Sequence, residues 1–287
     1  MCKYCIPFYY LVLSRLKSKI DRVSWIIIFI VPTFLLGLFF TDMSFYKYTL
    51  VFILANLVFY SLYEIGYMEN DIQTTKKEKN PTIRINNSEY SYLNQNYSRI
   101  IKIKYIIVFI LVLLLALIVE DIKRLELFIG VLIVSRLFFY LHNFFRSRLN
   151  ILTFFVLAIT KYVMILFLVI PSDKLILPIF MAIVIFPLLR TIEHASRNKY
   201  KLEAYSKVIG NHDLFRLKYY FFMVIISSII LYYFKIKSLF ILIFLLIYFL
   251  FFRFFSYLMV KKNIYKRDTL KTRDLKNKYI HSIKKRG

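Results

Sequence analysis

Acids, an amide and several cations are concentrated in "MENDIQTTKKEKNPTIR", residues 68–84, which directly follows a long apolar run. Carboxylate and amide oxygens are hard ligands of the kind that Mg²⁺ uses when it carries a substrate phosphate. The candidate catalytic residues and metal ligands in this stretch are Asn70, Asp71 and Glu78. Lys77 and Arg84 are candidate donors to the phosphate oxygens. The alternative is a solvated charged loop that does no chemistry.

The helix before this stretch adds a polar face. Glu64, Tyr67 and Asp71 follow one another at three- and four-residue spacing, which places them on one side of a helix that continues as far as Asp71. We therefore expect Glu64 and Tyr67 to line a cavity next to the candidate phosphate site.

A second cluster ends the fourth apolar run, in "SRLFFYLHNFFRSRLN". Arg136, Tyr140 and Asn143 form one stripe of a helix, and Arg136 lies about two turns inside the apolar run. A guanidinium there is costly unless it faces a polar cavity or a counter-ion, so Arg136 is a candidate phosphate ligand beside Tyr140 and Asn143. The alternative is that Arg136 snorkels toward the headgroups. Lys161, inside the next apolar run, is a weaker case of the same argument.

A third cluster follows the sixth apolar run, in "FPLLRTIEHASRNKYKLEAYSK". The three- and four-residue spacing of its charged residues places them on one helix face. These residues are Arg190, a candidate phosphate ligand, with Glu193, His194 and Arg197. The alternative is a surface ladder of ion pairs between Glu193 and the two arginines, which would have no ligand.

The composition identifies the class of protein that positions these clusters. Hydrophobic residues make up 60% of the 287 residues, and apolar runs long enough to cross a bilayer recur along the chain. This pattern excludes a soluble domain and predicts an all-α, polytopic membrane bundle around a central cavity. The net charge of +25 comes from basic loops between the apolar runs, so we expect no nucleic-acid partner. Cys2 and Cys5 form a lone C-x-x-C, which we expect to have no metal-binding or redox role.

Eight membrane helices are expected in a domain of residues 24–259. An amphipathic interfacial segment, 1–23, precedes this domain, and a basic tail, 260–287, follows it. The predicted spans are 24–41, 46–67, 102–119, 125–143, 150–170, 174–190, 217–234 and 237–259.

The distribution of cations predicts the orientation of these spans. The termini and the loops after the second, fourth and sixth helices carry 32 Lys and Arg, and the alternate loops carry six. This bias predicts that both termini face the cytoplasm. The opposite loops are as short as "PSDK", so we expect any chemistry at the cytoplasmic face of a bacterial inner membrane.

Taken in order, these features resemble the UbiA-type intramembrane prenyltransferases. "LSRLKSK" stands where that family has an L-x-R-x-K-like stretch. Asn70 and Asp71 match its first Asp-rich motif, in which Thr74 and Glu78 stand in place of later Asp residues, and Arg84 takes the place of an Arg in a basic stretch. The remaining matches are Tyr140, Arg146 and Arg148 between the fourth and fifth helices, and Glu193 at the second acidic motif.

The resemblance implies a transferase that uses a polyprenyl phosphate or diphosphate. It implies one Mg²⁺ held by Asn70, Asp71, Glu78 and Glu193, with Arg146 and Arg148 among the phosphate ligands. An unidentified acceptor would take the prenyl group, or the prenyl phosphate would itself accept a phosphosugar. The alternative hypothesis is a non-catalytic relative that carries or binds a lipid phosphate, since the acids are fewer than in the family. A transporter of soluble solutes is a third hypothesis.

Overall fold

The structure, a computed structural model, describes residues 3–77, 84–145 and 147–263. Within these ranges the protein is helical and contains no β-strand, which confirms the predicted all-α class. Seven helices in the described residues are long and apolar enough to cross a membrane, and counting a bent pair of shorter helices as one span gives eight. Glu78 and Arg146 lie outside the described residues, as do residues 264–287 of the predicted tail, and the side chain of Lys77 is likewise not described.

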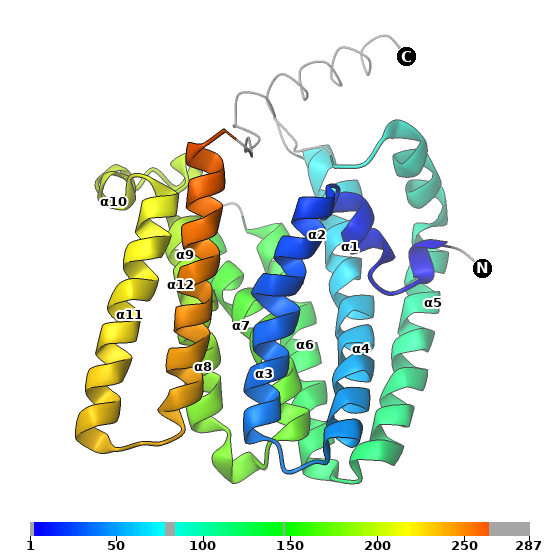
Figure 1. Cartoon of the computed structure of the whole chain (residues 1–287). Coiled ribbons are helices and arrows are strands. Elements are labelled where there is room, and N and C mark those ends of the chain that lie inside the picture. Colours follow the sequence, from blue (N-terminus) through cyan, green and yellow to red (C-terminus); the bar gives the residue numbers. More distant parts are fainter. Residues whose placement is uncertain (1–2, 78–83, 146, 264–287) are drawn as a thin grey trace.

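The main helices lie side by side, and Figure 1 labels the α-helices among them. They are α2 (Lys19–Trp25), η2 (Ile26–Ile30), α3 (Val31–Phe40), α4 (Phe45–Ile72), α5 (Asn87–Val119), α6 (Ile122–Phe144), α7 (Leu149–Val169), α8 (Ile176–Ile185), α9 (Pro187–Ala195), α11 (His212–Phe234) and α12 (Leu239–Lys261). The short elements are η1 (Lys3–Cys5), α1 (Tyr9–Ser14), η3 (Thr74–Lys77), η4 (Ser172–Lys174), η5 (Asn198–Tyr200) and α10 (Glu203–Ile209). Helices α2, η2 and α3 together form one span.

Helix α4 is central, because it packs against α5, α6 and α7. Helices α11 and α12 pair as a hairpin at one side of the bundle and meet the rest through α3, α8 and α9. We call the end at which α4, α6, α9 and α12 finish the basic end. It is the upper end in Figure 1, and the N-terminal segment and α10 lie there.

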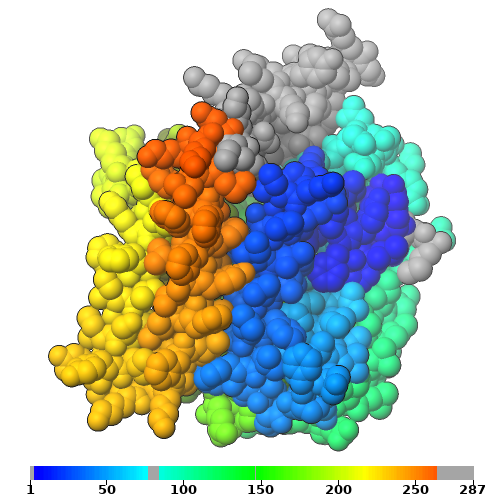
Figure 2. Space-filling view, in the orientation of Figure 1, coloured from blue at the N-terminus to red at the C-terminus, as the bar shows by residue number. Residues whose placement is uncertain are grey.

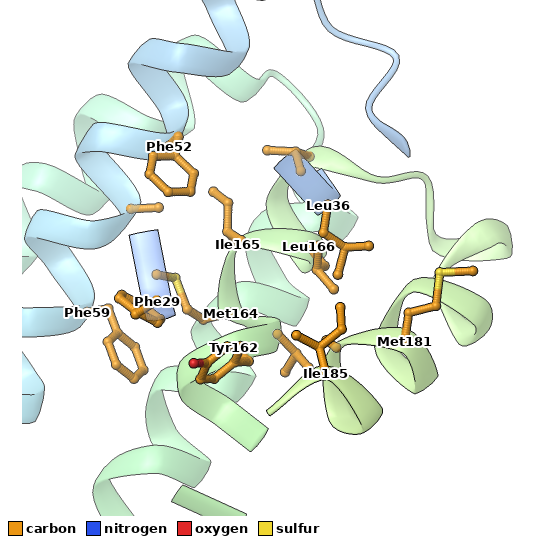
Figure 3. Close-up of a cluster of buried hydrophobic side chains, with 14 of the residues drawn as sticks. Phe29, Leu36, Phe52, Phe59, Tyr162, Met164, Ile165, Leu166, Met181 and Ile185 are labelled. Atoms are coloured by element: carbon orange, nitrogen blue, oxygen red, sulfur yellow. The ribbon is translucent and has the colours of Figure 1, made fainter. Parts of the chain in front are cut away.

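The hydrophobic core lies where η2, α3, α4, α7 and α8 meet, as Figure 3 shows for ten labelled side chains. Phe29, Phe59 and Tyr162 are among the core rings that are nearly inaccessible to solvent. Gly66 allows a close approach of α4 and α6, because a Cβ atom at this position would lie 2.3 Å from the ring of Phe139 on α6. By contrast, α5 exposes large apolar side chains such as Phe109 and Leu117, which suits a surface that faces lipid tails.

The N-terminal segment is folded onto the bundle. Tyr10, Leu11 and Leu16 are buried, and Figure 2 shows the N-terminal residues lying over the upper part of α4. The sequence predicts an amphipathic segment in the membrane interface at residues 1–23. Part of its apolar face is covered by protein instead, because Leu11 and Leu16 join the hydrophobic core.

The predicted span 174–190 is broken in the structure. Helices α8 and α9 meet at Phe186, where φ is −146°, and their axes differ by 43°. Pro187 explains the break, because a proline ring has no N–H to donate and clashes with the preceding turn of a helix. The expected span therefore exists as a bent pair.

Candidate functional site

A cavity of about 1080 Å³ lies between the helices, toward the basic end of the bundle. It extends from Arg84 and Lys199, near the helix ends, to Lys161 and Phe29, part-way along α7 and η2. Aromatic rings from α2, α4, α6 and α7 form much of its wall. A long apolar molecule with one charged end would match this combination of depth, aromatic wall and polar mouth.

Two irregular helix segments shape the inner part of the cavity. The first is η2, a π-helix, which is a local widening that often occurs at functional sites. Ile28 and Phe29 of η2 line the cavity. The carbonyl oxygens of Ile27 and Ile28 accept hydrogen bonds from the hydroxyls of Tyr248 (3.0 Å) and Tyr162 (2.7 Å).

The second irregular segment is the α8–α9 break, from which Phe186 lines the cavity. The carbonyl oxygens of Val184 and Ile185 accept hydrogen bonds from Tyr219 (2.6 Å) and Tyr220 (3.0 Å). Irregular backbone inside a bilayer is tolerated where it lines a cavity and its polar groups find partners. The tyrosine hydroxyls meet that requirement at both segments.

Positive charge dominates the cavity wall. Seven cationic side chains line it, whereas Asp21 is the only acid among its described lining residues. In surroundings of low dielectric, such an excess of one sign favours a ligand of the other sign. The seven cations are Arg15, Arg84, Lys161, Arg190, Arg197, Lys199 and Arg253.

Asp71 organises the cations nearest the N-terminal segment, a group that we call the mouth cluster (Tyr10, Arg15, Asp71 and Arg84). Arg15 donates two hydrogen bonds to the Asp71 carboxylate, at 2.7 and 3.1 Å, and Arg84 donates a third at 2.9 Å. The hydroxyl of Tyr10 donates a fourth, also at 2.9 Å. Burial acts to lower the pKa of the Arg15 guanidinium, but Asp71 outweighs this effect and the pKa is raised. Arg15 is therefore a permanent cation at this site.

A buried ion pair holds Arg15 in place. The backbone N–H of Leu11 donates to one oxygen of Glu64 at 2.6 Å, and Lys104 on α5 donates to the other at 2.8 Å. Both charged side chains are fully buried. Glu64 thus fixes the N-terminal segment to α4, and the guanidinium of Arg15 stacks over the ring of Tyr67, 4.5 Å from its centroid.

The inner cluster lies at the other side of the cavity, and we define it as Lys161, Arg190, Glu193, Arg216 and Arg253. Arg190 donates to one oxygen of Glu193 at 2.5 Å, and Arg216 donates to the other oxygen. Arg216 also pairs with Asp213 at 3.0 Å. Lys161 and Arg253 make no ion pair with a carboxylate in the part of the chain that the structure describes, and both line the cavity.

A hydrogen-bonded chain orients His194 beside the inner cluster. The side-chain nitrogen of Asn150 donates to the carbonyls of His142 and Phe145, so its oxygen accepts from the Tyr200 hydroxyl at 2.9 Å. The Tyr200 oxygen then accepts from Nε2 of His194 at 2.5 Å, and Nδ1 of His194 has no partner. Burial raises the pKa of Tyr200 to about 12, so its hydroxyl keeps its proton.

The described candidate metal ligands do not fit a metal ion. All oxygens of Asp71 and Glu193 accept hydrogen bonds from arginines, and the Asn70 side-chain nitrogen also donates to Asp71 at 3.2 Å. Within residues 3–77, 84–145 and 147–263, no group of three or more His, Cys, Asp or Glu side chains could hold one. Glu78 lies outside these ranges, so magnesium stays a prediction.

Several predicted residues do line the cavity, and others lie away from it. Those that line it are Tyr67, Asn70, Arg84, Asn143, Arg190, His194 and Arg197. Arg136 instead pairs with Glu69, Arg148 donates to the carbonyl of Tyr200, and Tyr140 is 58% exposed. The side chain of Glu64 is also outside the cavity, in its pair with Lys104.

Three residues that line the cavity were not predicted as site residues from the sequence: Arg15, Lys199 and Arg253. Arg253 could have been predicted as a site residue, because it interrupts the apolar run "LFILIFLLIYFLFFRFFSYLMV". The argument that singled out Arg136 applies to it equally. Arg15 carried a weaker signal, as one of several cations in the N-terminal segment.

Comparison with known proteins identifies no relative of this chain. No family model, no curated protein and no solved structure matches the chain. The functional argument therefore depends on the cavity and its charges.

Proposed function

We propose that this membrane protein binds a prenyl phosphate or diphosphate in its cavity and transfers the prenyl group, in the manner of UbiA-type prenyltransferases. The observation that carries the proposal is the cavity itself, which combines seven lining cations with eight lining Phe, Tyr and Trp side chains. A lipid phosphate presents the complementary features, an anionic head and an apolar chain. The excess of cations at the basic end supports an orientation in which the mouth faces the cytoplasm of a bacterial inner membrane.

The phosphate would bind at the mouth of the cavity. Arg15 and Arg84 both pair with the single carboxylate of Asp71, and both line the cavity. Arg197 and Lys199 line the same cavity and add donors. Arginine forks bind phosphate oxygens in a bidentate manner, and no metal ion is needed for that contact.

The same cations would support a transfer reaction. When the bond between the prenyl C1 and the diphosphate oxygen breaks, both electrons leave with the diphosphate, and the prenyl group becomes an allylic cation. Guanidinium groups stabilise the charge that grows on the leaving group. The rings of Tyr63, Tyr67 and Phe139 pack edge to face at the cavity wall, and their π faces can stabilise the cation until an acceptor attacks C1.

A non-catalytic lipid-phosphate carrier or scaffold is the second candidate. The observation that favours it is the pairing of Asp71 and Glu193 with arginines, since such carboxylates are occupied as cation partners. Both candidates require lipid-phosphate binding. Formation of a prenylated product and free diphosphate, in the presence of a pool of acceptors, would separate the transferase from the carrier.

Binding of a non-hydrolysable farnesyl diphosphate analogue to detergent-purified protein tests the proposal. We expect the analogue to raise the melting temperature of the wild type, since a ligand that binds the native state stabilises it. Arg15→Gln and Arg84→Gln should weaken the apparent affinity on the order of tenfold each, because each variant loses a charge-assisted contact. The matched control is Arg136→Gln, which removes an ion-paired arginine of the bundle that lies outside the cavity.

The same titration with Mg²⁺ and with EDTA tests the magnesium prediction. Equal stabilisation in both buffers is expected if arginines alone neutralise the phosphate. A steep requirement for Mg²⁺ would return Asp71 and Glu78 to the role of metal ligands. Absence of any stabilisation of the wild type by the analogue would refute the proposed function.

A further inference from the structure

Lys161 is a lysine deep in the bundle that has no acidic partner within residues 3–77, 84–145 and 147–263. It follows Leu149, the first residue of α7, by twelve positions, which is about 18 Å along a helix. Its ammonium lies over aromatic rings, 4.4 Å from the centroid of Phe29 and 5.8 Å from that of Tyr60. These contacts stabilise a cation only partly, because a ring quadrupole is a weaker partner than a carboxylate.

Arg253 is a second such cation. It is 8% exposed, lies eight residues before the end of α12, and lines the same cavity. Its Nε atom has no hydrogen-bond partner among the residues that the structure describes, and its side chain contacts the hydroxyl of Tyr220. A guanidinium that is more than nine-tenths buried and unpaired at Nε is a costly feature for a fold to keep without a ligand.

Arg190 connects these two residues electrostatically, because its charge repels both Lys161 and Arg253. Glu193 and Asp213 are the acids of this region, and they face four cations: Lys161, Arg190, Arg216 and Arg253. Among the described residues, two positive charges of this region therefore remain without a carboxylate counter-charge. A phosphate monoester carries about two negative charges at neutral pH.

We propose that Lys161, Arg190 and Arg253 form a second anion subsite at the inner side of the cavity, which binds a phosphate dianion. The subsite is separate from Arg15 and Arg84 of the mouth cluster, and its use by a second ligand depends on the proposed function. The phosphate belongs either to a soluble phosphate ester that enters the cavity beside the lipid or to the lipid itself. In the first case the cavity holds two phosphate-bearing ligands at once.

Lys161→Met is the decisive variant, because methionine keeps the length of the side chain and removes the uncompensated charge. We expect the ligand-free variant to melt at a higher temperature than the wild type, since an unpaired cation is removed from an aromatic pocket. Inorganic phosphate, compared with sodium chloride at equal ionic strength, should stabilise the wild type. The variant should need a roughly tenfold or higher phosphate concentration for the same shift.

A second variant controls for packing. Arg253→Lys keeps the charge and should retain most of the phosphate-dependent shift. A structural role of Lys161, through its ring contacts alone, predicts the opposite result for Lys161→Met, which is a lower melting temperature without ligand and an unchanged response to phosphate. That outcome would overturn the subsite.

The two sources of phosphate are separated by saturating the protein with farnesyl monophosphate before the phosphate titration. If inorganic phosphate still raises the melting temperature, the subsite takes a soluble ligand. If its effect disappears, the phosphate of the lipid occupies the subsite. A wild type that responds to inorganic phosphate but not to the farnesyl ligands would leave the subsite standing and refute the proposed function. A farnesyl response that depends on Arg15, together with a response to inorganic phosphate that is unchanged in Lys161→Met, would do the reverse.

Discussion

Lys104 and Lys161 are both lysines inside membrane-spanning helices, and their surroundings are opposite. Lys104 is fully buried on α5 and pairs with Glu64 at 2.8 Å, under the N-terminal segment. Lys161 lines the cavity from α7 and contacts aromatic rings, with no carboxylate paired to it in the described chain. The first region uses its lysine to hold elements together, and the second keeps its lysine available.

The comparison extends to the groups around each lysine. Near Lys104, the second oxygen of Glu64 is taken by the Leu11 N–H, so every charge and every acceptor of the pair is satisfied. Near Lys161, the π-helix and the α8–α9 break open space that side chains do not fill. A fully hydrogen-bonded network makes a region rigid, whereas an open cavity lined by cations can bind an anionic ligand.

The largest effect is expected from Lys104→Met. This change leaves the Glu64 carboxylate buried without its counter-charge, which should lower the free energy of unfolding by about 3–5 kcal/mol. The unfolding transition in mixed detergent–SDS micelles measures this loss. Lys161→Met in the same assay should give a change of the opposite sign, and equal losses from both lysines would break the comparison.

A double variant separates charge from packing in this test. Glu64→Gln combined with Lys104→Met removes both charges and keeps an oxygen that can accept from the Leu11 N–H. We expect this variant to recover most of the stability lost in the single variant, because replacing both partners of a buried pair is often close to neutral. Recovery of less than half would mean that the packing of the Lys104 side chain, and not its charge, holds the N-terminal segment.

The sequence predicted correctly those features that depend on the residues of a single helix. Apolar runs predicted eight spans, and the structure contains seven spanning helices in its described part plus the bent pair. Charges inside apolar runs predicted polar contacts, and Arg136 does have such a contact, in Glu69. The partner could not be read from the sequence, because the two residues lie 67 positions apart on different helices.

The candidate site was predicted less completely, for the same physical reason. Asp71 was expected to bind metal because the sequence placed Asn70 and Glu78 nearby. The structure brings Arg15 to it from 56 residues away, together with the Tyr10 hydroxyl. Only the packing of the N-terminal segment on α4 makes that meeting possible, and no local pattern encodes it.

A smaller effect is expected from filling the close approach of α4 and α6. Gly66→Ala would place a Cβ atom 2.3 Å from the ring of Phe139, in the paired, rigid region of the molecule. Forcing this ring away should lower the free energy of unfolding by about 1–3 kcal/mol. Gly130→Ala on α6 is the matched control, because nothing lies within 4 Å of its Cβ position. That control should raise the free energy of unfolding by less than about 1 kcal/mol. If Gly66→Ala and Gly130→Ala lowered the free energy of unfolding by similar amounts, the close approach at Gly66 would not be the cause of the loss.

The smallest effect is expected from an ion pair like Glu64–Lys104 but exposed to solvent. Asp42 pairs with Arg124 at 2.6 Å at the end of the bundle opposite the basic end, and about half of its carboxylate side chain is exposed. The hydrogen bond from Arg124 lowers the pKa of Asp42 below its ordinary value. Because the folded pKa is the lower one, the pair contributes stability above the unfolded value near pH ~4, and the contribution is lost as the pH falls through the folded value.

Asp42→Asn should therefore lower the free energy of unfolding by no more than about 1 kcal/mol near neutral pH, since solvent and salt screen an exposed pair. The melting temperatures of wild type and variant, measured from pH 7 to pH 3, should converge below pH ~4 as Asp42 protonates in the wild type. Added salt should also narrow the difference at neutral pH. A loss at pH 7 as large as that of Lys104→Met would show that burial is not what distinguishes the strong pair from the weak one.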